Sequence, residues 1–257
     1  MPRTVVAALF LLHGIIALGQ STSTSDATAI SLAAKSAAAL TAGNAVSDVT
    51  LNGGAISVLG SDYETGTATL KANVAGESRV DLNLNSGART DVRNLANGFP
   101  AGAWSKNGGK STGYPQHNCW TDAAWFFPAL SSLTETANTQ FVFQFVGAEQ
   151  HNGLASQHIR VRQTRSGLSA IQDLSAMDFY LDPTSFLPMS VAFTLHTDTD
   201  IKTNIPAIVN FADYRQVNGF QVPFHIQQML NGSVILDITV TDVAFNTGLP
   251  DSSFTLP

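Results

Sequence analysis

The sequence has few of the residues on which common functional sites depend. Its 257 residues include a single cysteine, Cys119, so no disulfide can form within the chain. Charged residues make up only 12% of the composition, the formal net charge is -6, and no basic patch of the kind that marks nucleic-acid binding is visible. The longest apolar stretch, Val5 to Leu18, is shorter than the roughly twenty residues that a membrane-spanning helix needs. We therefore expect no nucleic-acid partner and no transmembrane anchor in the mature chain.

Sequence signatures of cofactors and metals are also missing. There is no His-Glu-x-x-His or paired-cysteine spacing, and the histidines at 117, 151, 158, 196 and 225 are scattered singly, whereas a zinc site needs three or four converging ligands. There is no Gly-x-Ser-x-Gly elbow of a serine hydrolase. No glycine-rich loop follows a strand and opens a helix, as a nucleotide site requires. We expect no cofactor, no metal and no catalytic site.

The amino terminus has the layout of a secretory signal peptide. Pro2 and Arg3 precede the apolar stretch, and the chain turns polar at Gln20. The small residues Ala17 and Gly19 lie where a signal peptidase cleaves. We predict that residues 1–19 are removed, that 20–26 form a disordered start, and that 27–257 form one domain. The protein is then periplasmic or otherwise exported, and soluble after cleavage.

Two segments show helical spacing. In the first, apolar residues recur from Ile30 to Ala38, with Asp26 as the cap and Gly43 as the stop. A loop from Gly98 leads into the second, where Trp120, Ala123, Ala124, Phe127 and Leu130 recur at helical spacing. Pro128 should kink this second helix.

Most of the remaining chain alternates between apolar and polar residues, which predicts antiparallel strands with one wet face. Asn218-Gly219 and Asn231-Gly232 each lie between two such runs and predict tight hairpins, because both residue types accept positive φ angles. Asp182-Pro183 predicts another turn. The predicted strands are 49–59, 67–74, 79–85, 88–95, 141–146, 158–164, 179–181, 189–195, 207–217, 222–230 and 234–243.

This pattern predicts a mainly β fold with two short helices. About ten twisted strands tend to curl, and a curled sheet of this size encloses more space than its own side chains can fill. We expect an incomplete, half-open β-barrel with a helical lid over an apolar pocket. The candidate pocket residues are Trp104, Trp120, Ala124, Phe127 and Leu130. The alternative for these aromatic residues is plain core packing.

The carboxy-terminal third contains a series of short motifs. In chain order they are Asp178-Phe179-Tyr180-Leu181-Asp182-Pro183, Leu187-Pro188, Asp213-Tyr214-Arg215, Val217-Asn218-Gly219, Val222-Pro223, Asn246, Leu249-Pro250-Asp251, Phe254 and Pro257. With these motifs, the chain resembles the LolA-like family of periplasmic lipoprotein-carrier and outer-membrane lipoprotein-sorting proteins. The resemblance is clearest over residues 178–257, and residues 27–177 agree in layout. The motifs are structural, and none is a catalytic signature.

The resemblance implies a half-open barrel closed by helices, with an apolar cavity that receives acyl chains. The function that we expect is a soluble periplasmic carrier or binding protein for an acyl-chain or lipid-like ligand, and not an enzyme. Its partners would be a lipid or acylated ligand, or an envelope protein. The family's cavity-gating arginine is not assigned to a position by the sequence.

Two other hypotheses stay open. The first is an envelope protein-interaction or scaffold module whose core is filled. The second is a cysteine-dependent hydrolase, since His117, Asn118 and Cys119 are the residue types of thiol hydrolases. Adjacent side chains do not face one another in a helix or a strand, so these three make a poor triad. Asp178 and Asp182 flank Tyr180 and favour a role in shaping the turn over acid–base work.

Overall fold

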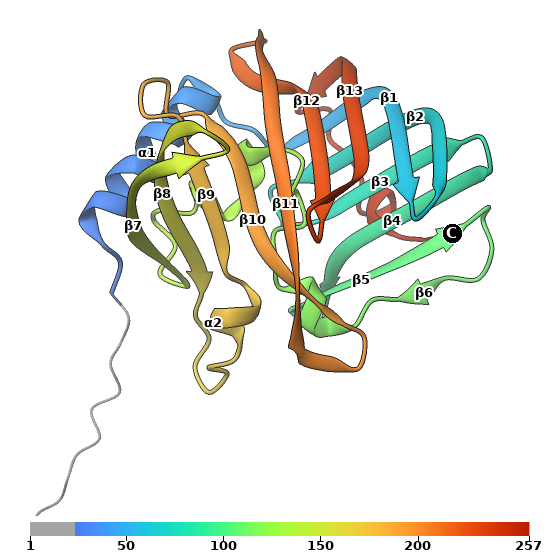
Figure 1. The fold of residues 1–257 in the computed structure, drawn as a ribbon, viewed down its shortest axis with the longest axis horizontal. Coiled ribbons are helices and arrows are strands. Elements are labelled where there is room, and N and C mark those ends of the chain that lie inside the picture. The colour runs from blue at the N-terminus through green and yellow to red at the C-terminus, as the bar shows by residue number, and fades with distance from the viewer. Residues whose placement is uncertain (1–23, 257) are drawn as a thin grey trace, which may run out of the picture.

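The computed structural model describes residues 24–256, which form one continuous antiparallel sheet of thirteen strands (Figure 1). The order in the sheet is β6-β5-β4-β3-β2-β1-β13-β12-β11-β10-β9-β8-β7, so β6 and β7 lie at opposite edges and the barrel is not closed. The predicted half-open, mainly β fold is confirmed. The strands are β1 (Asp48–Leu59), β2 (Asp62–Asn73), β3 (Ser78–Leu84), β4 (Gly87–Ala96), β5 (Phe99–Lys106), β6 (Thr112–Gly113), β7 (Phe141–His151), β8 (Leu154–Gln163), β9 (Met177–Leu181), β10 (Pro188–Thr197), β11 (Asp200–Val217), β12 (Phe220–Leu230) and β13 (Ser233–Phe245).

All eleven predicted strands are present, and the alternation of apolar residues explains them. Along β3, for example, Val80 and Leu82 are buried, while Arg79 and Asp81, which alternate with them, are half-buried. Both predicted Asn-Gly hairpins are present as well: Asn218 and Gly219 have φ angles of 51° and 89°, and the second pair is similar. At the third turn, Asp182 accepts hydrogen bonds from the backbone N–H groups of Thr184 and Ser185.

The first helix, α1 (Ala27–Thr41), begins and ends where the sequence predicts. The Asp26 side chain accepts a hydrogen bond from the Thr28 backbone N–H at 2.7 Å and caps the helix. The buried face differs from the expected one, since Ala34 and Ala38 are exposed. The face that packs against the sheet instead contains the two leucines of the helix. The buried residues are Ala29, Leu32, Ala33, Ser36 and Leu40.

The segment between Gly98 and Leu133 differs from the expectation. Its first part is not a loop: Phe99–Lys106 forms β5 and pairs with β4. Its second part is not an α-helix but three 3₁₀ helices, η1 (Gln116–Cys119), η2 (Pro128–Leu130) and η3 (Ser132–Thr134). Pro128 has no N–H to donate, and the extended backbone at Phe127 interrupts the helix before it. A four-residue α2 (Ile171–Leu174) was not predicted, and η4 (Asp251–Phe254) ends the fold.

Residues 114–140, here called the cover segment, join the two edges of the sheet. The cover segment packs with α1, and α1 in turn contacts β7, β8 and β12. Phe126, Phe127 and Leu133 of this segment are fully buried in the core. The half of the curved sheet around β7–β9 is therefore filled by α1 and the cover segment.

Two predicted segments lie mostly outside the described residues. The predicted signal peptide, 1–19, lies entirely outside them. Of the start predicted to be disordered, 20–26, only the last three residues are described, and the Asp26 backbone N–H donates to the Phe143 carbonyl at 2.7 Å.

Candidate functional site

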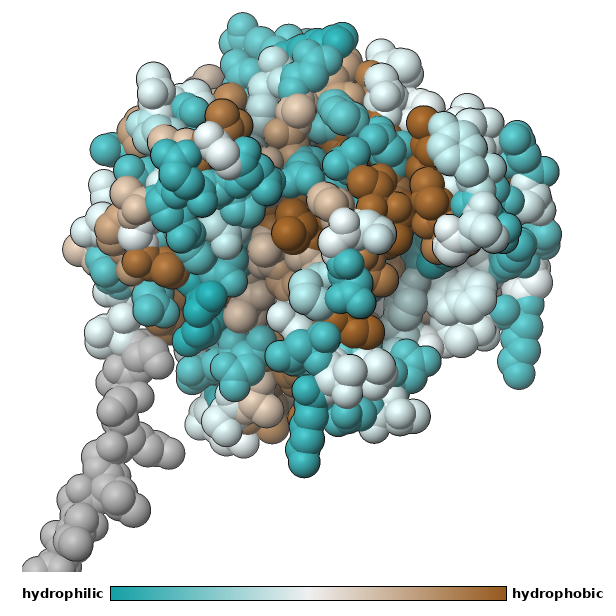
Figure 2. Space-filling model, in the orientation of Figure 1, coloured by the Kyte–Doolittle hydropathy of each residue, from teal (hydrophilic) through white to brown (hydrophobic). Residues whose placement is uncertain are grey.

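A cavity of about 340 Å³ lies between the β3–β4 wall and the ends of β10–β13. Its volume is at the low end of the range for small-molecule sites. On the face shown in Figure 2, apolar side chains gather near the middle of the molecule and hydrophilic ones surround them. The cavity lies in the part of the curved sheet's interior that the cover segment does not fill.

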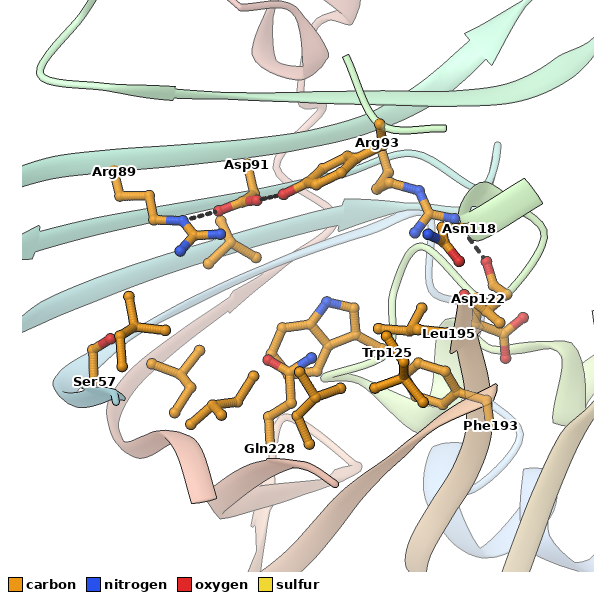
Figure 3. Close-up of a pocket in the computed structure, with 18 of the residues that line it drawn as sticks. Ser57, Arg89, Asp91, Arg93, Asn118, Asp122, Trp125, Phe193, Leu195 and Gln228 are labelled. Carbon is orange, nitrogen blue, oxygen red and sulfur yellow. Dashed lines mark hydrogen bonds and ion pairs between the residues drawn. The ribbon is translucent and has the colours of Figure 1, made fainter. Parts of the chain in front are cut away.

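The apolar part of the lining comes largely from strands far apart in the sequence. Figure 3 shows Trp125 reaching into the cavity, with Leu195 and Phe193 of β10 beside it. Several of the apolar lining residues are only half-buried, and polar side chains, Ser57 and Gln228 among them, share the lining. The apolar lining consists of Leu59, Val80, Leu82, Trp125, Phe193, Leu195, Ile205, Leu230, Ile235 and Leu236.

One wall carries charge. Arg89, Asp91 and Arg93 alternate along β4 and all face the cavity (Figure 3). Arg89 Nε lies 3.0 Å from an Asp91 carboxylate oxygen, and the Tyr114 hydroxyl donates to the other oxygen of the same carboxylate. Burial raises the pKa of Asp91, and the guanidinium of Arg89 opposes this effect. Arg89 is thus neutralised by its neighbour.

Arg93 has no such neighbour. Its Nη2 donates to the carbonyl oxygens of Cys119 at 2.5 Å and Thr121 at 3.0 Å, both in the cover segment. Its Nε is buried with no hydrogen-bond partner, and no carboxylate of the described residues forms an ion pair with it. Burial lowers the pKa of Arg93, but an arginine stays protonated in proteins. Arg93 is therefore a largely buried cation whose hydrogen bonds all go to backbone carbonyls, while the Asp122 carboxylate is near enough to attract it without forming an ion pair.

Asp122 lies at the same end of the cavity. One of its carboxylate oxygens accepts hydrogen bonds from the Ser132 backbone N–H at 3.0 Å and from the Ser132 hydroxyl at 2.9 Å. Burial raises the pKa of Asp122 to about 6, against the opposing effect of the Ser132 hydrogen bonds. Its charge therefore changes in the weakly acidic range.

The structure places the five sequence-predicted pocket residues away from this cavity. Ala124 and Phe127 are buried in the core, and Trp104 lies on β5 beneath the Arg89 guanidinium. Trp120 and Leu130 line a second hollow of about 340 Å³ on the other side of the cover segment. Ligand contact by these five residues stays a prediction.

The residues that do line the cavity were missed because they are remote in sequence. Leu59, Leu195 and Leu230 come from three different hairpins. Trp125 is the exception, since the sequence left it open between pocket lining and core packing, and the structure places it in the lining.

The thiol-hydrolase residues do not form a site. Cys119 is 1% exposed, and burial raises the pKa of its thiol. His117 Nε2 lies 3.0 Å from the Thr197 carbonyl oxygen, and the Asn118 side chain bonds the backbone of His196. No histidine of residues 24–256 forms a hydrogen bond with the thiol, whose contact is the Pro115 carbonyl.

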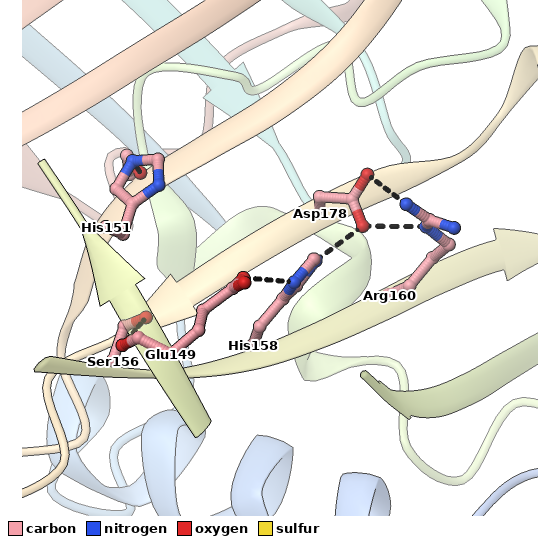
Figure 4. A network of polar contacts seen from close by, with 7 residues as sticks. Glu149, His151, Ser156, His158, Arg160 and Asp178 are labelled. Carbon is pink, nitrogen blue, oxygen red and sulfur yellow. Dashed lines mark hydrogen bonds and ion pairs between the residues drawn. The ribbon is translucent and has the colours of Figure 1, made fainter. Parts of the chain in front are cut away.

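A polar network occupies the opposite, outer face of β8 and β9 (Figure 4). Asp178 accepts two hydrogen bonds from Arg160, at 2.7 and 2.9 Å, and His158 Nε2 lies 2.7 Å from the same carboxylate. The other ring nitrogen of His158 lies 2.7 Å from Glu149. Burial would raise the pKa of Asp178, but the contacts with His158 and Arg160 outweigh it and lower the pKa. The network ties three strands together and faces away from the cavity.

Residues 24–256 contain neither a membrane-spanning helix nor a metal-binding cluster. No helix there is long and apolar enough to cross a bilayer. No group of three or more His, Cys, Asp or Glu side chains in that part of the chain is arranged to hold a metal ion.

Comparison with known proteins gives a clear result only at the level of structure. No protein-family model matches the sequence, and no curated protein matches it. Solved structures do match. A domain described as an outer membrane lipoprotein-sorting protein domain from Vibrio parahaemolyticus superimposes with a TM-score of 0.59 at 14% identity, over 89% of this chain and 96% of that one.

Two further structures agree with it. A DUF1329 family protein from Desulfovibrio piger gives a TM-score of 0.56 at 8% identity, over 89% of this chain and 96% of that one. A LolA superfamily protein from Nitrosomonas europaea gives 0.53 at 10% identity, over 88% and 97%. The expected resemblance is therefore confirmed at the level of fold: this chain has the open, half-barrel fold of the LolA superfamily and of lipoprotein-sorting domain proteins.

Proposed function

We propose that this protein is an exported carrier or binding protein that holds a hydrophobic, acyl-chain-like ligand in the cavity between β3–β4 and β10–β13. The observation that carries the proposal is the cavity itself. Although much of the interior is closely packed, a cavity of about 340 Å³ with ten leucine, isoleucine, valine, phenylalanine and tryptophan side chains in its lining stays open. An apolar pocket with a few polar groups at one end is the usual form of a small-molecule site.

The shared fold supports the same function. Two of the similar structures are described as a lipoprotein-sorting domain and a LolA superfamily protein, and they cover nearly 90% of this chain. A ligand with acyl chains fits an interior of leucine and isoleucine, because each buried methylene group contributes about 0.8 kcal/mol. The rival hypothesis of a scaffold module requires a filled core, which the open cavity argues against.

Within this proposal, Arg93 is the residue that holds the cover closed. Its two hydrogen bonds, to the Cys119 and Thr121 carbonyls, connect β4 to the cover segment at the edge of the cavity. A ligand that separates the cover from the wall would have to break these bonds.

Titration of the purified protein with a fluorescent hydrophobic probe tests the proposal. We expect saturable uptake of the probe and its displacement by long-chain alcohols or acids. Mass spectrometry of an organic-solvent extract of the folded protein should identify a lipid-like compound at a fixed ratio to protein. Protein that has been stripped of lipid and takes up no probe would contradict the proposal.

A further inference from the structure

Arg93 has more hydrogen-bonding capacity than the protein uses. A guanidinium carries five N–H donors, and only those on Nη2 donate to residues that the structure describes. The buried Nε has no partner. Burying a charge without an ion partner costs several kcal/mol, which neutral carbonyl acceptors offset only in part. The Arg93 guanidinium therefore has no anionic hydrogen-bond acceptor.

The other charged groups around the cavity do not meet this requirement. Asp91 is occupied by Arg89 and by the Tyr114 hydroxyl. Asp122 directs its bonded oxygen to Ser132 and makes no ion pair with Arg93. Asp198 lies in the turn between β10 and β11, at another part of the lining. The residues of β4 itself, two arginines and one aspartate, carry a net charge of +1, and Asp122 attracts Arg93 without taking up its free N–H donors.

The position of Arg93 relates this charge to the apolar lining. Figure 3 shows its guanidinium at one end of the cavity, with Trp125, Leu195 and Phe193 nearby. A neutral acyl chain would fill the apolar part of the cavity and leave the Arg93 guanidinium without an anionic partner. A ligand with an aliphatic chain and an anionic head would satisfy both parts, because carboxylates and phosphates match the planar fork of a guanidinium.

We propose that the ligand is an anionic amphiphile, an aliphatic chain with a carboxylate or phosphate head, whose head binds Arg93 while the chain lies against β10, β12 and β13. This inference rests on the proposed function and specifies the ligand class of the same cavity. It assigns Arg93 two roles, since Nη2 holds the cover and the remaining donors face the head of the ligand.

Probes with the same chain and different heads test the inference. Dodecanoate, dodecyl phosphate, dodecanol and dodecyltrimethylammonium are compared at pH 8 by displacement of a fluorescent probe, below their micelle concentrations. A hydrogen bond to a charged group contributes about 1.5–3 kcal/mol, so we expect the two anions to bind at least about tenfold more tightly than dodecanol. The cation should bind most weakly. Carboxylate and phosphate heads are distinguished by which of the two anions binds better.

Variants then locate the head. In Arg93→Gln, dodecanoate should bind no more tightly than dodecanol does to the same variant, while Arg89→Gln, which removes a guanidinium already paired with Asp91, should keep most of the preference. Equal affinity of the wild-type protein for dodecanoate and dodecanol would overturn the inference and leave the carrier function standing. Failure of all four probes to bind would overturn the carrier function itself.

Because Arg93 also holds the cover, Arg93→Gln could lose its fold, which circular dichroism would reveal. In that case Arg93→Lys decides the question. Lysine keeps the charge as a single ammonium and should retain a preference for anions that added salt weakens. A preference for anions that is the same in wild type, Arg93→Lys and Arg89→Gln at every salt concentration would place the head elsewhere.

Discussion

Arg93 on β4 donates a hydrogen bond to the carbonyl oxygen of Thr121 at 3.0 Å, across 28 positions of sequence. This contact joins the wall of the cavity to the segment that covers it. Arg93, Thr121 and Asp122 also line both hollows of the interior, so they form the partition between the two. The state of this partition should govern both stability and access to the cavity.

Gly102 should be needed for Arg93 to take its place. A Cβ atom at position 102 would lie 2.6 Å from Arg93 Cδ and 2.9 Å from the Val92 carbonyl oxygen, so the Arg93 side chain or the backbone must shift. We predict that Gly102→Ala lowers the melting temperature and weakens the preference for anionic probes. Gly54→Ala is the matched control, because a Cβ there meets nothing closer than 4.0 Å. Equal melting temperatures for the two variants would contradict this role of Gly102.

Asp122 should make the protein more stable as the medium turns weakly acidic. Burial raises its pKa to about 6 in the folded protein, whereas the unfolded chain titrates near 3.9. Between these values the folded state binds a proton that the unfolded state does not, so this group's contribution rises as the pH falls from about 7 to about 4. Asp122→Asn should therefore raise the melting temperature at pH 8 and change it little at pH 4.5. The same gain at both values would show that Asp122 does not titrate in this way.

The polar network around Asp178 should make the protein less stable as the medium turns acidic. Although burial opposes the effect, the contacts with His158 and Arg160 lower the pKa of Asp178 in the folded protein, so its contribution is present above about pH 4 and is lost at lower pH. We predict that Asp178→Asn costs about 2 kcal/mol at pH 7, measured by urea unfolding, and that the difference shrinks below pH 4. Asp213→Asn removes an exposed ion pair with Arg215 and serves as the control. A loss in the control as large as that for Asp178→Asn would contradict the special role of the network.

The carboxy-terminal turn should stabilise the cavity wall from outside. Phe254 is fully buried in η4, which contacts β3 and β4, and its carbonyl oxygen accepts a hydrogen bond from Asn94. Phe254→Ala should cost about 3–5 kcal/mol, as large-to-small substitutions in cores do. Leu154→Ala, at a side chain that is 61% exposed, should change the unfolding free energy little. A Phe254→Ala loss near that of Leu154→Ala would mean that the turn is not a structural plug.

The sequence predicts most of the fold because strand alternation and turn chemistry are local signals. β5 was not predicted, although the Asn97-Gly98 turn before it is such a signal. Asn97 and Gly98 have φ angles of 54° and 75°, the same conformation as the Asn218-Gly219 hairpin that was recognised. The strand after this turn contains Pro100 and Gly102 and has a half-exposed Phe99, so it lacks the alternation that marked the other strands.

The candidate site could not be predicted in the same way. Alternation identifies the strand at 88–95, but it does not say which face is turned inward, because a period of two gives two equivalent faces. The face with Arg89, Asp91 and Arg93 reads as the wet one, and only the curvature of the sheet, which brings β4 opposite β10–β13, places it inside. Likewise the aromatic cluster at 120–130 was assigned to one helical face, whereas the non-helical turn before Pro128 buries Phe127 and directs Trp125 into the cavity.

A matched pair of variants tests the central claim, that the cavity is the binding site. Leu195 lines the cavity, and Thr194, its neighbour on β10, is half-buried and lies on the opposite face of the sheet. We predict that Leu195→Trp fills the cavity and lowers the affinity for a fluorescent hydrophobic probe at least about tenfold, the scale expected when about 1.4 kcal/mol or more of binding is lost. Thr194→Trp should bind the probe as wild type does. Unchanged probe affinity in a folded Leu195→Trp protein would contradict the account.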